Sequence, residues 1–72
     1  MRFTQHHEIT KSMKKPFTLI VVPRSIEEKC RRTKFASGQQ ALQKLRAMKL
    51  DASRFYGAEI VDSNGLVIAE LE

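Results

Sequence analysis

The stretch Phe17-Thr18-Leu19-Ile20-Val21-Val22 decides how the rest of the chain must fold. It is a nearly continuous apolar run, rich in β-branched residues, and Pro23 follows it directly. Such a run is typical of a strand inside a sheet, because successive side chains point to opposite faces and both faces are apolar here. We therefore expect a central strand that is covered on both sides.

The segment after this strand has two interpretations. As a strand, residues 29–36 place Arg31, Thr33 and Phe35 on one face and Cys30, Arg32 and Lys34 on the other. As a helix, the segment would use Ser25 as its N-cap and Glu28 as the capping-box partner, but the helical apolar spacing fails after Cys30. The pattern favours a strand, with residues 25–28 forming the turn before it.

Further along, the sequence predicts one helix from Ser37 to about Leu50. Ser37 is a good N-cap and Gln40 stands three residues later, which is the spacing of a capping box. Apolar side chains recur at helical spacing at Ala41, Leu42, Leu45 and Met48. This stripe predicts that one side of the helix packs on a sheet.

The last part of the chain, residues 56–71, predicts a β-hairpin around Asn64-Gly65. This dipeptide favours a two-residue type I′ turn, in which both central residues have positive φ. With that turn, Glu59 lies opposite Glu70. Val61, Leu66 and Ile68 then lie on the sheet face away from the helix.

The order β-β-α-β-β predicts an α+β fold. We expect a two-layer sandwich in which one helix packs on one face of a four-stranded, mostly antiparallel sheet. Residues 14–72 form this single small domain. Residues 1–13 are expected to be a flexible N-terminal arm or extension, or a short extra strand, because they show no apolar period.

Composition limits what such a domain does. Hydrophobic residues make up 42% of the 72 residues and Trp is absent, so the core is thin and pairing with another chain is a standing possibility. The single Cys30 excludes an internal disulfide framework and is expected to be a partly buried structural residue. No apolar run is long enough for a membrane span or a secretory leader, so we expect a cytoplasmic protein.

No residue pattern indicates catalysis. The three glycines are isolated, so no phosphate-binding loop is present. His6 and His7 are adjacent and would point to opposite sides of an extended arm, which does not suit a shared metal ion. We expect no enzyme activity, no catalytic residue, no metal, no cofactor and no small-molecule substrate.

Charge is the most informative property of the sequence. Thirteen Lys and Arg stand against eight Asp and Glu, and all thirteen lie in residues 1–54. Residues 55–72 hold four of the acids and no Lys or Arg. A basic stripe of Lys29, Arg31, Arg32 and Lys34 would either neutralise the Glu59 and Glu70 pair or meet a nucleic acid, a nucleoprotein or an acidic protein. Both interpretations stay open, and Tyr56 is a candidate for stacking on a base.

The apolar set Val61, Leu66 and Ile68 also has two interpretations. Three apolar groups are more than a fully solvated sheet face needs. The N-terminal arm would cover them through Phe3 or Ile9, or they would form the interface of a homodimer. The second interpretation gives an alternative function, a structural or regulatory homodimer with no nucleic-acid role.

Phe55-Tyr56-Gly57 opens the third expected strand, and Asn64-Gly65-Leu66-Val67 forms the final turn. With the β-β-α-β-β order and the basic charge, residues 14–70 resemble small phage-encoded anti-CRISPR proteins of the type I class. The resemblance implies a non-enzymatic inhibitor that docks on a Cas effector, a nucleoprotein in the bacterial host cytoplasm, and blocks its access to DNA. It implies contacts through Arg31, Arg32, Lys34 and Tyr56.

Overall fold

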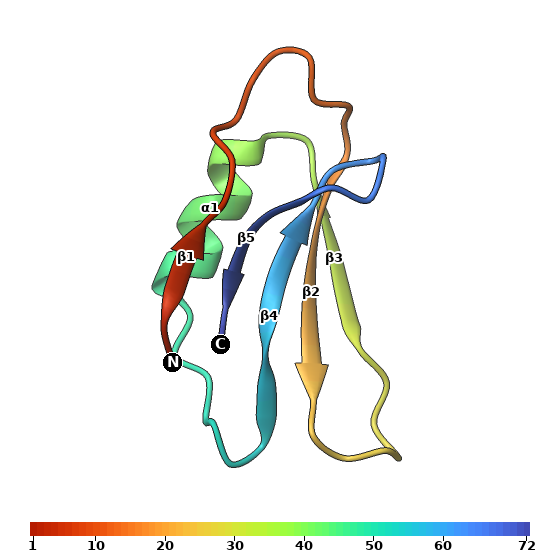
Figure 1. Cartoon of the computed structure of the whole chain (residues 1–72). Coiled ribbons are helices and arrows are strands. Elements are labelled where there is room, and N and C mark those ends of the chain that lie inside the picture. The colour runs from red at the N-terminus through yellow and green to blue at the C-terminus, as the bar shows by residue number, and fades with distance from the viewer.

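The computed structural model describes all 72 residues and contains one sheet and one helix (Figure 1). The elements are β1 (Phe3–Gln5), β2 (Phe17–Pro23), β3 (Arg31–Phe35), α1 (Gly38–Ala47), β4 (Phe55–Val61) and β5 (Val67–Leu71). The strand order is β1-β5-β4-β2-β3, and every neighbouring pair is antiparallel. The α+β class, with one helix on an antiparallel sheet, is confirmed, but the sheet has five strands instead of four.

The fifth strand comes from the N-terminal segment. Strand β1 pairs with β5, with Phe3 opposite Leu71. Beyond this pair, the backbones of Arg2 and Glu72 exchange two hydrogen bonds. The Phe3 ring packs against the core and lies 5.1 Å from the guanidinium carbon of Arg46. Phe3 thus anchors β1, which is too short to show the alternating pattern of a strand. Of the two interpretations of the first thirteen residues, the short extra strand is present at residues 3–5.

Residues 31–35 form a strand, as predicted. The pairing of β2 with β3 sets Phe17 opposite Phe35 and Val21 opposite Arg31. In the turn before β3, Glu28 N–H donates to the carbonyl of Ser25 at 3.3 Å. A helix over this segment would have left β2 without a partner on one side.

Helix α1 begins where the sequence predicts. The Ser37 side chain accepts a hydrogen bond from Gln40 N–H at 3.4 Å, which satisfies one of the free amide groups of the first turn. The helix ends at Ala47, earlier than the predicted Leu50, because the backbone is already extended at Met48. Leu50 packs against the core from outside the helix.

The turn between β4 and β5 differs from the predicted type I′ turn. Gly65 is the only residue of this turn with positive φ, at +85°. Its N–H donates to the carbonyl of Asp62 at 3.1 Å, and Asp62 N–H donates to the carbonyl of Leu66 at 3.1 Å. The Asp62 carboxylate also accepts from Asn64 and Leu66 N–H, each at 2.9 Å. These bonds favour a three-residue loop, a type I turn followed by a left-handed glycine.

The longer loop shifts the pairing by one residue only next to the turn. Further from the turn, Glu59 still pairs with Glu70, as predicted, and Ile60 pairs with Ala69. Next along the strand, however, Val61 pairs with Val67, so Ile68 is an extra residue in a β-bulge. Ile68 and Ala69 are both fully buried in the core. The prediction that Ile68 lies on the face away from the helix is therefore wrong.

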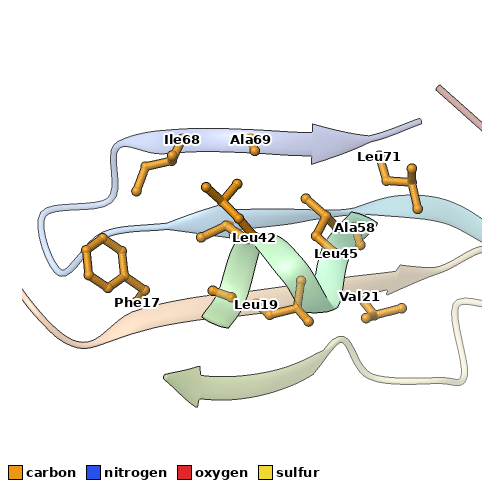
Figure 2. Packing of buried hydrophobic residues seen from close by; sticks show 11 residues of the cluster. Phe17, Leu19, Val21, Leu42, Leu45, Ala58, Ile68, Ala69 and Leu71 are labelled. Carbon is orange, nitrogen blue, oxygen red and sulfur yellow. The ribbon is translucent and has the colours of Figure 1, made fainter. Parts of the chain in front are cut away.

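The two faces of the sheet differ in cover. Eleven buried apolar residues form a core between α1 and one sheet face, and Figure 2 shows Leu42 and Leu45 of the helix above strand residues such as Leu19. Burial alternates strictly along β2, with Leu19 and Val21 buried and Ile20 and Val22 only half-buried. Strand β2 is an interior strand between β4 and β3, but β4 is the central one. The expected cover on both sides of β2 is not present, because only one face carries a helix.

We call the other side of the sheet the open face. Residues that pair across strands share a face, so the register defines a row from β1 to β3 on this side. The row is Thr4, Glu70, Glu59, Ile20 and Arg32. A second row holds Val67, Val61, Thr18 and Lys34.

Candidate functional site

The clearest concentration of charge is on the hairpin formed by β2 and β3. We call its cationic side chains the basic hairpin: Arg24, Lys29, Arg31, Arg32 and Lys34. All five are exposed, and two acids, Glu27 and Glu28, lie in the connecting turn. Because β3 is an edge strand, no other strand covers the outer side of this hairpin.

The cations of β3 point to two different faces. Arg31 pairs with Val21 and shares the helix side of the sheet, whereas Arg32 pairs with Ile20 and Lys34 with Thr18 on the open face. This alternation is what the sequence predicts. Because of this alternation, one flat partner surface cannot contact Arg31 together with Arg32 and Lys34.

Of the two open interpretations of the basic strand, neutralisation of Glu59 and Glu70 is not seen in the structure. Strand β2 lies between β3 and β4, so Ile20 separates Arg32 from Glu59 in the same row. Two strand spacings amount to roughly 10 Å, too far for an ion pair. The only ion pair within 4.0 Å joins His6 Nε2 and Glu70 Oε1, at 2.9 Å. None of the thirteen Lys and Arg side chains is therefore paired with an acid of the chain.

The acids instead gather at the other side of the open face. Glu59, Glu70 and Glu72 line a shallow hollow beside Val22 and Tyr56. Glu59 and Glu70 are directly opposite each other, which costs a few tenths to about 1 kcal/mol unless a cation is near. The His6 side chain lies beside this pair, with its Nε2 at 2.9 Å from Glu70 Oε1.

Tyr56 lies at this acidic hollow and not on the basic strand. Its side chain is exposed, and the guanidinium carbon of Arg24 lies 4.5 Å from the centre of its ring. Arg24 is held there because its Nε–H donates to the carbonyl of Ala52 at 2.6 Å. The sequence does not indicate this role of Arg24, since its position over Tyr56 depends on the pairing of β2 with β4.

A second cationic area lies at the start of α1. Lys11 and Lys15 line a hollow with Ser37 and Gly38 at the N-terminus of the helix. The first turn of α1 holds no acid. Sequence reasoning missed this area, because the segment before β2 was not expected to pack beside the helix.

The predicted self-association residues separate in the structure. Val61 is half-buried on the open face, Leu66 is 40% exposed at the turn, and Ile68 is in the core. Val67 takes the place expected for Ile68. The N-terminal segment does not cover this face, because Phe3 pairs opposite core residue Leu71 and Ile9 packs against Gly38 of the helix.

Few groups offer chemistry beyond charge. Cys30 is exposed in the turn before β3, so the prediction of a partly buried cysteine is wrong. No three His, Cys, Asp or Glu side chains come together as a metal site.

Hydrogen bonds from the Ser53 hydroxyl and backbone lower the pKa of Asp51, whose carboxylate orders the loop between α1 and β4. Helix α1 is neither long nor apolar enough to cross a bilayer.

Comparison with known proteins gives no guide to the site. No family model, no curated protein and no solved structure matches the chain. Charge and surface geometry are therefore the properties of the chain that bear on its function.

Proposed function

We propose that this protein is a small non-enzymatic binding module that engages a nucleic acid or a nucleoprotein through the basic hairpin. One observation carries the proposal. Thirteen Lys and Arg side chains make no ion pair within the chain, and five of them lie on one hairpin at the edge of the sheet. Cations left without internal partners favour an anionic ligand, and phosphate backbones present the densest array of anions.

The position of the basic hairpin leaves it accessible to this ligand. Strand β2 also pairs with β4, so the parts of the hairpin free to contact a phosphate backbone are the outer edge of β3 and the turn before it. Arg31 on one face of this edge and Arg32 on the other would then contact phosphates from both sides. Lys29 lies in the turn before β3, at the end of the hairpin. Contacts of this kind fix position more than sequence, so we expect binding with little base preference.

The resemblance to type I anti-CRISPR proteins gives the proposal a more specific form. In that form the module docks on a Cas effector in the bacterial host and blocks its access to DNA. Arg31, Arg32 and Lys34 would contact DNA or RNA phosphates in place of the effector's own cationic residues. Tyr56 and Arg24 would contact the rim of the interface.

The test is a binding titration against labelled duplex DNA, single-stranded DNA and RNA over a series of salt concentrations. We expect affinity to fall steeply with salt, because each phosphate contact releases counterions. Arg31→Ala should weaken binding and flatten the slope of log K against log salt by about 0.9. Lys29→Ala should act in the same direction.

Arg2→Ala is the matched control. Arg2 is an exposed arginine next to β1, at the opposite edge of the sheet from β3. Its removal should leave the slope unchanged. The proposal is wrong if no polyanion binds at low salt, or if Arg2→Ala and Arg31→Ala reduce binding equally.

A further inference from the structure

The open face has an apolar centre that no part of the chain covers. Ile20, Val22, Val61 and Val67 are half-buried there by their neighbours on the sheet. Phe3, Ile9 and Met13 of the N-terminal segment pack on the opposite side together with α1, whereas Thr4 and His6 lie at the acidic edge of the open face, beside Glu70. A strand with apolar residues on both faces, as β2 has, is typical of a sheet with layers on both sides.

Charge is divided across this face. Along one row, Glu70 and Glu59 lie on β5 and β4, then Ile20 on β2, then Arg32 on the edge strand β3. Lys34 lies beside Arg32 on the same strand and face. The face is therefore acidic on one side, apolar in the middle and basic on the other side.

A surface of this kind is complementary to a second copy of itself. If two open faces meet about a two-fold axis parallel to the strands, the basic side of each copy lies over the acidic side of the other. A two-fold axis across the strands would place Arg32 against Arg32 and is excluded by repulsion. We propose that two copies pair in the first arrangement, with Arg32 of each over the Glu59 and Glu70 pair of the other.

The size of the face sets the strength of this dimer. In chain order the five strands hold 3, 7, 5, 7 and 5 residues, so at about 3.4 Å per residue and about 4.8 Å spacing they offer roughly 440 Å² per copy. The total of roughly 900 Å² is below the size of a stable specific interface and fits a weak one. We therefore expect a dimer that dissociates on dilution and that depends strongly on its charge pairs.

This inference goes beyond the proposed function and makes two uses of Arg32 and Lys34 mutually exclusive. In the dimer they face the second copy, and only Arg31 on the helix side and Lys29 in the turn stay available to an anionic ligand, whereas the monomer offers all four. Because an axis parallel to the strands keeps their ends together, the β2–β3 turns of both copies lie at the same end of the dimer.

Sedimentation velocity over a concentration series, without nucleic acid, tests the pairing. We expect a monomer–dimer equilibrium for the natural chain. Arg32→Glu and Glu59→Arg should each weaken dimerisation at least about tenfold, because like charges then face each other. Neither residue has an ion-pair partner within the chain, so both variants should fold, which circular dichroism checks.

The decisive sample is an equimolar mixture of the Arg32→Glu and Glu59→Arg variants. In a mixed pair, opposite charges face each other again, so the mixture should dimerise more strongly than either variant alone. Arg31→Glu is the matched control, since it makes the same change on the other face, and should leave dimerisation unaltered. Lys34→Glu should weaken it.

Three results would overturn the inference: a monomer at every concentration, a mixture no stronger than its components, or equal effects of Arg31→Glu and Arg32→Glu. These outcomes are independent of the proposed function. Loss of nucleic-acid binding with an intact dimer would reject the function alone, and binding by a strict monomer would reject the pairing alone.

Discussion

The two faces of this sheet are built from similar residues and have opposite environments. On β2, Leu19 and Val21 are buried under α1, whereas Ile20 and Val22 on the open face are half-buried. The hydrophobic pattern of a strand thus indicates which residues prefer burial, but not which of them the chain itself covers. In a chain of 72 residues, one helix covers one face, and the apolar residues left over are available to a partner.

The largest expected difference between the faces concerns neighbouring residues of β5. Ile68→Lys should prevent folding, because it buries an unpaired charge in the core. A cost above about 4 kcal/mol is comparable with the whole stability of a domain this small. Val67→Lys, one residue earlier and on the open face, should cost less than about 1 kcal/mol.

Circular dichroism and urea unfolding of both β5 variants provide the measurement. Equal losses of stability would mean that Val67 and Ile68 are equally buried, and the bulge would then be absent. A folded Ile68→Lys variant would have the same consequence.

A smaller difference is expected between Ile60 and Ile20, which lie on adjacent strands and opposite faces. Ile60→Ala should cost about 2–5 kcal/mol, since Ile60 is fully buried. Ile20→Ala should cost about 1 kcal/mol, because neighbouring residues cover only part of the Ile20 side chain and less apolar burial is lost. Urea unfolding at low protein concentration, where self-association is absent, compares them. A larger loss for Ile20 than for Ile60 would reverse the assignment of the faces.

The smallest effect concerns the start of the helix that makes the two faces different. Ser37→Ala should lower the free energy of unfolding by about 1 kcal/mol, because the N–H of Gln40 loses its acceptor. Ser63→Ala, in the loop between β4 and β5, removes a hydroxyl without a hydrogen-bond partner and should change stability by less than about 0.5 kcal/mol. Thermal unfolding of the two variants checks the contrast, and similar melting temperatures would show that the cap is not used.

Features that depend on local chemistry could be predicted from the sequence. Ser37 and Gln40 are three residues apart and predict the start of α1 without knowledge of the rest of the fold. The alternation of Arg31 and Arg32 likewise follows from the two-residue period of a strand. The pairing of Glu59 with Glu70 is also as predicted, but only because the β-bulge at Ile68 offsets the extra residue of the turn.

Features that depend on competition between two local structures, or on the order of the strands, could not be predicted. Asn64-Gly65 permits a two-residue turn, but the Asp62 carboxylate binds two turn amides and favours the longer loop, which moves Ile68 into the core. The separation of Arg32 from Glu59 follows from the insertion of β2 between β3 and β4, and strand order is not encoded in any single segment. In the sequence of β1, Phe3 is the only residue that indicates a buried strand position.

The pairing of β1 with β5 has a practical consequence for engineering the chain. Arg2 and Glu72 lie side by side, so the two ends leave the molecule at the same edge (Figure 1). A short linker would therefore close the chain into a circle, and new ends could be opened in the exposed turn around Ile26. Tags or labels attached next to Arg2 or Glu72 would emerge at the edge opposite β3 and leave the basic hairpin unobstructed.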